Sequence, residues 1–173
     1  MKKRLQIVIA KAGVTSRRDA EHLIASGRIS VNGVIVTQLG TKVDPEKDVV
    51  KFDGKRLKSK KLEYLLLYKP QGYITAMKDA KGFRTLADLG IPTHLSPAGR
   101  LDYNSEGLIL LSNDGELINK IIHPKYHLPK YYEVKIQGIP TKEDILKIEG
   151  GIYIEEKKTR PIKVKIIKQT DKN

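Results

Sequence analysis

The sequence has no cysteine, and other features are missing along with it. Without cysteine the chain forms no disulfide, offers no thiol nucleophile and binds no metal through thiolates. No apolar run approaches the roughly 18 residues that a membrane span needs, and no hydrophobic secretory segment follows Met1. We therefore expect neither a membrane nor an export role. The histidines lack metal-ligand spacing, so we expect no metal site; they are His22, His94, His123 and His127.

Charge of both signs is present, but positive charge dominates. The 173 residues include 33 Lys and Arg against 20 Asp and Glu, which gives a formal net charge of +13. An excess of this kind favours a polyanionic partner, nucleic acid before a membrane surface. Hydrophobic residues at 39% and charged residues at 31% are typical of a folded globular protein. Together these features predict a cytoplasmic protein that binds RNA or DNA.

The positive charge is concentrated near the start of the chain. Residues 1–61 carry 15 basic and 6 acidic side chains, a net of +9, whereas the rest of the chain carries 18 and 14, a net of +4. The length suits one or two domains, and the seam over residues 57–62 is polar and charged, as in a linker. We therefore expect a small basic domain over residues 1–57, a linker over 58–62 and a larger domain over 63–173.

Local patterns predict two short helices and a hairpin in the small domain. Apolar residues three and four apart predict a first helix that Gly13 ends. Ser16 is placed to cap a second helix, which ends at Gly27. Two β-prone runs, 29–31 and 34–36, flank an Asn-Gly pair, which is a strong hairpin signal.

Four cations gather around these helices, and they admit two interpretations. Arg17 and Arg18 fall in the first turn of the second helix, where a positive charge opposes the helix dipole. Because such a cluster is poor design for stability alone, one interpretation is a phosphate-binding surface that recognises RNA mostly by shape. The other is an ordinary solvated face. The candidate RNA-binding residues are Lys11, Arg17, Arg18 and Arg28.

The larger domain shows four strand-like segments. Nearly continuous apolar runs predict buried strands over residues 64–68 and 107–111. Period-two alternation predicts a strand over residues 131–136, with Tyr132 on its apolar face, and a half-buried strand over 162–166.

Helical patterns lie between these strands. Residues 117–122 carry an apolar stripe that Pro124 ends, and Thr141 is placed to cap a further helix with Ile145, Leu146 and Ile148 directed inward. The order of elements predicts an α+β protein. Its small α/β domain of two helices and a hairpin precedes a mixed, mainly antiparallel sheet with flanking helices.

Side chains capable of chemistry lie between the first two of these strands. In an extended Arg100-Leu101-Asp102 segment, the guanidinium and the carboxylate emerge on one side and the leucine on the other. For an arbitrary Arg-x-Asp sequence, the simplest interpretation is a structural salt bridge at a loop edge. Tyr132 alone fits a core tyrosine, and Lys69 either lines an RNA path or closes a turn.

Several stretches resemble known families. Residues 4–36, RLQIVIAKAGVTSRRDAEHLIASGRISVNGVIV, resemble the alpha-L RNA-binding module that a small-subunit ribosomal protein shares with several RNA-modifying enzymes. GRLDYNSEGLILLSNDGEL at 99–117 closely resembles the signature of the pseudouridine synthases that act on ribosomal RNA and carry such a module. YLLLYKPQGYIT at 64–75 and HPKYHLPKYYEV at 123–134 resemble segments that precede and follow that signature.

This resemblance implies an isomerase that converts a uridine of ribosomal RNA to pseudouridine. It implies that Asp102 is the catalytic aspartate, that Arg100 lies beside it and that Tyr132 packs on the target base. The reaction detaches the base and rejoins it through carbon, so it requires a snug pocket and no cofactor, and the nucleotide must leave its stack. The alternatives are an RNA-binding protein of the same ancestry without catalysis, or a DNA-binding protein, for which no recognition helix is evident.

Members of this family usually continue past the point where this sequence ends. Their last segment carries a basic, Arg-rich motif that completes one wall of the cleft, whereas residues 166–173 are a polar tail without it. The sequence therefore predicts a catalytic domain truncated at its C-terminus, with apolar sheet surface exposed. Its activity then depends on whether that wall is dispensable.

Overall fold

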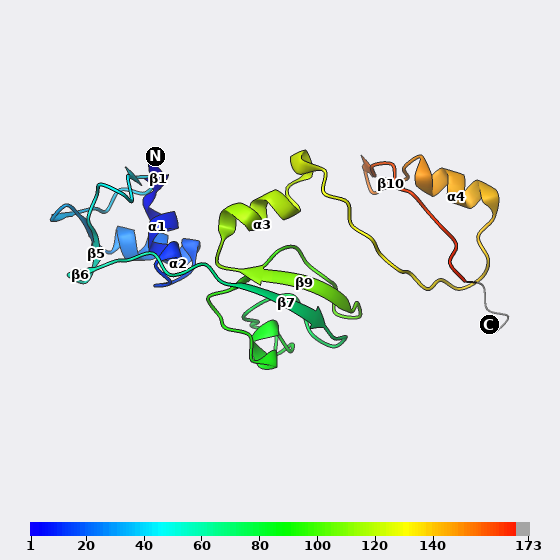
Figure 1. The fold of residues 1–173 in the computed structure, drawn as a ribbon, viewed down its shortest axis with the longest axis horizontal. Coiled ribbons are helices and arrows are strands. Elements are labelled where there is room, and N and C mark those ends of the chain that lie inside the picture. Colours follow the sequence, from blue (N-terminus) through cyan, green and yellow to red (C-terminus); the bar gives the residue numbers. More distant parts are fainter. Residues whose placement is uncertain (169–173) are drawn as a thin grey trace. The chain divides into compact units, whose positions relative to one another are not determined.

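A computed structural model describes residues 1–168 of the chain (Figure 1). The chain divides into two compact units, Met1–Leu128 and Pro129–Asn173. The first unit contains the small basic region and the sheet that carries the candidate site. The α+β class predicted from the sequence is confirmed, because short helices accompany antiparallel sheets in the first unit.

Two short helices form the start of the first unit, where the sequence predicted them. Helix α1 spans Leu5–Lys11 and helix α2 spans Arg17–Ala25. The Ser16 hydroxyl accepts a hydrogen bond from the main-chain N–H of Asp19, the expected N-terminal cap of α2. Gly13 ends the first helix at a φ of 71°, a left-handed conformation that favours glycine.

The predicted hairpin is also present and belongs to a four-stranded antiparallel sheet of order β3-β2-β5-β6. Its turn places Asn32 at φ 52° and Gly33 at φ 86°, the positive values that an Asn-Gly hairpin turn requires. A separate two-stranded pairing joins β1 to β4. The strand bounds are β1 Lys3–Arg4, β2 Ile29–Val31, β3 Val34–Ile35, β4 Lys42–Val43, β5 Val50–Phe52 and β6 Lys55–Arg56.

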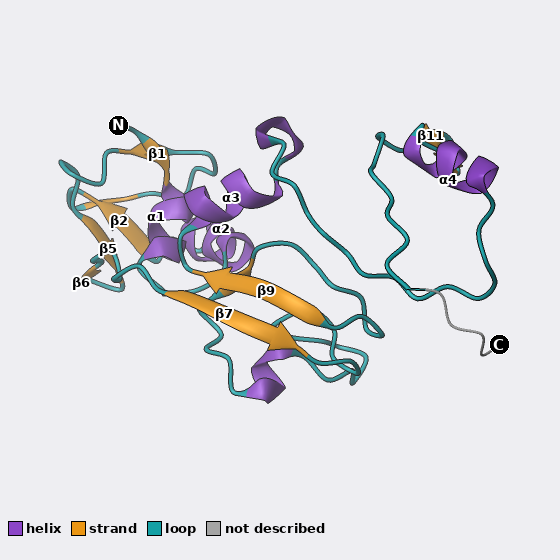
Figure 2. Ribbon diagram, turned by 45° about the vertical axis from the view of Figure 1, so that its right-hand side comes forward, coloured by secondary structure: helices purple, strands orange, loops and turns teal. Residues whose placement is uncertain are grey.

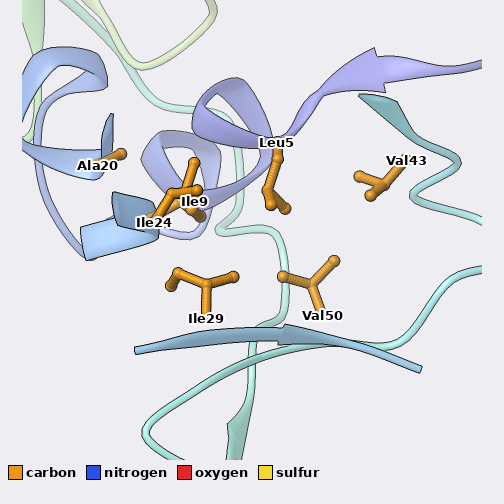
Figure 3. Packing of buried hydrophobic residues seen from close by; sticks show 7 residues of the cluster. All are labelled: Leu5, Ile9, Ala20, Ile24, Ile29, Val43 and Val50. Carbon is orange, nitrogen blue, oxygen red and sulfur yellow. The ribbon is translucent and has the colours of Figure 1, made fainter. Parts of the chain in front are cut away.

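Figure 3 shows the core of this small region, where both helices pack against the sheet. Burying each large aliphatic side chain contributes about 1.5–3 kcal/mol to folding. The apolar positions that indicated the two helices in the sequence supply most of this core. Its fully or almost fully buried members are Leu5, Ile9, Ala20, Ile24, Ile29, Val43 and Val50.

A three-stranded antiparallel sheet of order β7-β9-β8 follows, and its two long strands, β7 and β9, lie side by side in Figure 2. Strand β7 spans Tyr64–Lys69, β8 spans Ser96–Pro97 and β9 spans Gly107–Ser112. A short 3-10 helix, η1, covers Leu86–Leu89. One face of the sheet packs on a second core of Leu86, Ile91, Leu95, Ile109 and Leu111.

The other face of this sheet differs from the sequence prediction of strands buried on both sides. Tyr64, Leu66 and Tyr68 alternate along β7 and are exposed, and Leu108 on β9 is 68% exposed. Continuous apolar runs cannot by themselves distinguish one covered face from two, because the covering layer comes from elsewhere in the chain. Within residues 1–128 only one face of β7 and β9 is covered by the core.

Two further helical segments complete the first unit. Helix α3 spans Gly115–Ile122, with the Asp114 carboxylate capping its first turn, and a 3-10 turn, η2, covers Pro124–Tyr126. The prediction of this helix, ended near Pro124, is confirmed. Among residues 1–168 no helix exceeds nine residues, so none has the length or the apolar run needed to cross a bilayer.

In the second unit one sequence prediction is confirmed and two are wrong. Helix α4, Lys142–Glu149, begins at the predicted Thr141 cap, although Leu146 and Ile148 are exposed rather than inward. Residues 131–136 and 162–166 are not strands. Alternating residues form a strand only with a hydrogen-bonded neighbour, and in the described part of this unit the paired strands are instead β10, Tyr153–Ile154, and β11, Lys157–Lys158.

Candidate active site

The candidate catalytic segment runs from β8 to β9 and ends in a loop at the start of β9. Leu101 packs against the second core, whereas Arg100 and Asp102 on either side of it are exposed. This alternation is the one that the sequence predicted for an extended Arg-Leu-Asp segment. It presents the Asp102 carboxylate to solvent from a position anchored by a neighbouring core residue.

Thr75 fixes this segment to the chain that follows β7. Its hydroxyl donates to the Leu101 carbonyl at 2.6 Å and lies 3.0 Å from the Leu101 main-chain nitrogen, whose N–H it accepts. One residue beyond Asp102, the Tyr103 carbonyl accepts from the Gly72 N–H at 2.9 Å. The main chain on both sides of Asp102 is therefore held in place. Sequence reasoning missed Thr75, because nothing local indicates a contact across 26 positions.

Lys69, at the end of β7, is fully buried. Its ammonium donates to the carbonyls of Pro70 at 2.9 Å and Ser105 at 2.7 Å, which joins the turn after β7 to the loop that carries Asp102. Burial lowers the pKa of Lys69 below its usual 10.5, and the negative charges of Asp102 and Glu106 oppose that change only in part. Of the two roles that the sequence left open, closing a turn matches this position.

The other two predicted site residues are Arg100 and Tyr132, and they belong to different units of the chain. Among the ion pairs of residues 1–168, none joins Arg100 to Asp102, so the simple salt bridge is not formed. Tyr132 belongs to the second unit, where it lies outside any strand and is 68% exposed. Its expected inward orientation depended on a strand that is absent, so the core-tyrosine interpretation is wrong.

The candidate RNA-binding cations divide into engaged and exposed groups. Arg28 forms an ion pair with Asp53 and stacks on Phe52 at 4.7 Å from the ring centre. The Lys11 ammonium lies 3.1 Å from the Glu116 carboxylate. By contrast, Arg17 and Arg18 are exposed at the start of α2. The guanidinium of Arg17 lies so close to Gly115 that a Cβ there would meet it at 2.8 Å.

Glu116, at the start of α3, binds two lysines of the small region at once. Its carboxylate accepts from Lys3 at 2.8 Å and from Lys11 at 3.1 Å. These hydrogen bonds, aided by the attraction of the two positive charges, lower the pKa of Glu116 from 4.5 to about 2. The contact is partly solvated, since the Glu116 side chain is 67% exposed. It is nevertheless a direct link between α3 and the region that carries the basic cluster.

Replacing Glu116 by Gln should flatten the acid dependence of stability. Because its folded pKa is depressed, ionised Glu116 stabilises the fold above pH 4.5, and that stabilisation is lost as the pH falls from about 4.5 to 2. Exposure limits the effect to about 1 kcal/mol or less. Urea unfolding at pH 7 and pH 3, in low and high salt, measures it; exposed Glu133→Gln is the control. Equal pH dependence in Glu116→Gln and the parent chain would contradict the expectation.

Chemically, this arrangement offers a carboxylate on a braced, solvent-facing loop. A carboxylate can act as a nucleophile at carbon or assist cleavage of a glycosidic bond and proton transfer. Among residues 1–168 no group of three or more His, Asp or Glu side chains is arranged to hold a metal ion. The same part of the fold also carries the exposed Arg100 and the buried Lys69 ammonium, whose pKa is lowered by burial, an effect that the Asp102 charge opposes in part.

Comparison with known families matches two parts of the chain. Residues 63–173 match the RNA pseudouridylate synthase family, and residues 3–50 match the S4 domain. The first match contains the Asp102 loop, Lys69 and Tyr132, and the second contains α1, α2 and the hairpin. The two matched regions therefore lie on opposite sides of the polar segment 57–62 in the sequence.

Individual proteins give the same picture. A ribosomal large subunit pseudouridine synthase B from Bacillus subtilis is 49% identical over 166 residues, which cover 95% of this chain and 68% of that protein. An uncharacterized RNA pseudouridine synthase from Aquifex aeolicus is 42% identical over 100% of this chain and 71% of its own length. A crystal structure of a pseudouridylate synthase matches with a TM-score of 0.54 at 27% identity, covering 95% of this chain and 73% of that one.

Proposed function

This chain belongs to the RNA pseudouridylate synthase family, and from that premise we propose that it converts a uridine of ribosomal RNA to pseudouridine with Asp102 as the catalytic carboxylate. The observation that carries the assignment is the Asp102 loop, in which Thr75, Lys69 and the Leu101 contact hold the backbone while the carboxylate faces solvent. A group that must meet a large external substrate needs this combination of fixed backbone and open access.

The substrate class follows from two independent features. The S4 match covers residues 3–50, which together with the adjoining residues up to 61 form the part of the chain that carries most of the net positive charge, as binding to structured RNA requires. In addition, the Bacillus subtilis relative is named for the large ribosomal subunit. We therefore assign ribosomal RNA as the substrate, and the cytoplasm, where that RNA is found, as the place of action.

The reaction requires the target uridine to leave its stack and enter the protein, at a cost of a few kcal/mol. We assign Tyr132 to pack on the extruded base, which restores about 1–3 kcal/mol of stacking. Arg100 then guides the RNA backbone beside Asp102, since guanidinium groups bind phosphate through paired hydrogen bonds. Lys69 supports this site through its hydrogen bonds to the carbonyls of Pro70 and Ser105, which join the turn after β7 to the Asp102 loop.

The test is a pseudouridine assay on ribosomal RNA that lacks modifications. The 173-residue chain is incubated with the RNA, and the product is mapped by carbodiimide labelling and primer extension. Conversion at one position is the expected result. No conversion, with RNA affinity retained, would contradict the assignment and would favour a binding protein of the same ancestry.

The double change Arg17→Ala and Arg18→Ala should weaken RNA binding by about tenfold at about 0.1 M salt. Both side chains are exposed at the start of α2, where they can meet phosphates. Because two cations that bind phosphates are removed, the slope of log affinity against log salt should also fall by about two units. Filter binding across a salt series measures both quantities, with Lys55→Ala and Arg56→Ala on β6 as the matched pair. An unchanged salt slope would argue against this surface.

A further inference from the structure

The segment after β7 forms a loop over residues 72–86 beside the candidate catalytic aspartate. Its ends are joined by backbone hydrogen bonds, and the Thr75 hydroxyl fixes it to the Leu101 segment. The tip spans residues 77–83. The bonds that join the ends are Ile74 N–H to the Arg84 carbonyl at 2.8 Å and Leu86 N–H to the Ala76 carbonyl at 2.9 Å.

One aromatic ring of this loop, that of Phe83, contacts Tyr103, the residue that follows Asp102. The rings of Phe83 and Tyr103 lie edge to face, with their centroids 5.8 Å apart. Phe83 is 49% exposed and Tyr103 is 43% exposed. The guanidinium of Arg84 lies 5.9 Å from the ring centre of Tyr73. A hollow of about 410 Å³ lies beside Phe83 and Arg84, and its lining also includes Lys78, Asp79 and Asp88. This volume is in the range of small-ligand sites.

The loop's charges favour an anionic ligand. Lys78, Lys81 and Arg84 are exposed cations on the segment. Its one carboxylate, Asp79, accepts from the main-chain N–H groups of Lys81 and Phe83, and Asp88 of the adjoining η1 accepts from the N–H of Thr85. The acidic groups therefore maintain the loop's shape, whereas the basic groups are left facing solvent. Exposed rings next to exposed cations suit a nucleotide, which offers a base to stack and a phosphate to bind.

We propose that Phe83, Tyr103 and Arg84 form a second nucleotide subsite, which holds the RNA nucleotide next to the target uridine. Its base stacks on the open face of Phe83, and its phosphate is bound by Arg84 and Lys78. Extruding the uridine leaves its neighbour without a stacking partner, and the Phe83 ring takes that place. This inference rests on the proposed function, because the catalytic position of Asp102 makes the neighbouring nucleotide the ligand.

The test uses fluorescein-labelled single-stranded RNA pentamers with a central uridine. One is intact, and two others lack the base on the 5′ or on the 3′ side of that uridine. In the Asp102→Asn background, Phe83→Leu should weaken binding of the intact pentamer by about fivefold or more. For the one abasic pentamer that lacks the base stacked on Phe83, the same substitution should change the affinity by less than about twofold. Equal effects on all three RNAs, or none on any, would overturn the proposal. Anisotropy measures the affinities.

One control and one further variant complete the design. Tyr126→Leu removes another exposed ring with a cation above it, Lys125 at 4.8 Å, and should leave all three affinities unchanged. Arg84→Gln should reduce the salt slope by about 0.7 units, the single-strand value for one phosphate.

The two proposals fail in distinguishable ways. Pseudouridine formed by the parent chain, together with Phe83→Leu affinities equal to those of the parent, overturns the subsite and leaves the function standing. Stacking that depends on Phe83, without any pseudouridine from the parent chain, shows that Phe83 binds an RNA base but overturns the proposed function, and with it the identity of that nucleotide as the neighbour of a target uridine.

Discussion

Asp102→Asn should abolish pseudouridine formation, with single-turnover rates at least about 1,000-fold below the parent, a loss of about 4 kcal/mol in transition-state stabilisation. Asn has nearly the same shape as Asp but carries no charge and is a far weaker nucleophile, so only the chemistry of the carboxylate is removed. The Leu101 anchor and the Thr75 hydrogen bonds involve neighbouring main chain and core, so the fold should be unaffected.

RNA affinity separates this loss from a binding defect. Asp102→Asn removes one negative charge near a polyanion, so its Kd should stay within about twofold of the parent value. Glu106→Gln is the matched control, because it neutralises another exposed carboxylate on the same loop and should keep near-parent turnover. Measurable turnover in Asp102→Asn, or an equal loss in Glu106→Gln, would rule out Asp102 as the catalytic carboxylate.

Lys69→Met should both destabilise the first unit and impair catalysis. Met fills a similar volume but leaves the Pro70 and Ser105 carbonyls without their charged donor in a buried position. A buried acceptor left unpaired costs about 1–3 kcal/mol. We expect the free energy of unfolding to fall by about 2 kcal/mol and turnover to fall at least about tenfold, since the Asp102 loop loses its tie to β7.

The pH dependence of stability gives a second signature of Lys69. Its folded pKa lies below 10.5, so between these two values the unfolded chain binds more protons than the folded one. In the parent, this group therefore makes stability rise as the pH approaches 10.5. Lys69→Met should lack that rise, whereas exposed Lys120→Met should retain it, in chemical unfolding from neutral pH to pH 10.5. If Lys69→Met keeps the parent's pH dependence of stability and the parent's turnover, the buried hydrogen bonds of Lys69 do not have the role described.

Features set by neighbouring residues could be predicted from the sequence. The caps at Ser16 and Thr141 and the Asn-Gly turn depend on interactions within about three positions, and all were located correctly. The alternation around Leu101 was equally local. In each case the backbone conformation is decided by side chains that are close in the chain.

Features set by distant partners could not be predicted. The Thr75 bonds to Leu101 span 26 positions, and the Lys69 bond to Ser105 spans 36. The apolar pattern around Tyr132 favoured a strand, but a pattern cannot supply the neighbouring strand that pairing requires. The hydrogen bonds that hold the candidate site could therefore be identified only from the structure, whereas Asp102 itself was identified from its sequence motif.

The way in which the 72–86 loop is attached has a consequence for protein engineering and for divergence among relatives. Main-chain hydrogen bonds join its ends and Thr75 holds it to the Leu101 segment, whereas the side-chain hydrogen bonds of the tip run to Asp79 within the tip. Insertions and exchanges are tolerated best where few such bonds are broken. We therefore expect the tip outside Phe83, whose ring contacts Tyr103, to accept insertions and exchanges with little effect on Asp102. Under the proposed subsite, changes in the tip would alter how the neighbouring nucleotide is held and leave the Asp102 carboxylate in place.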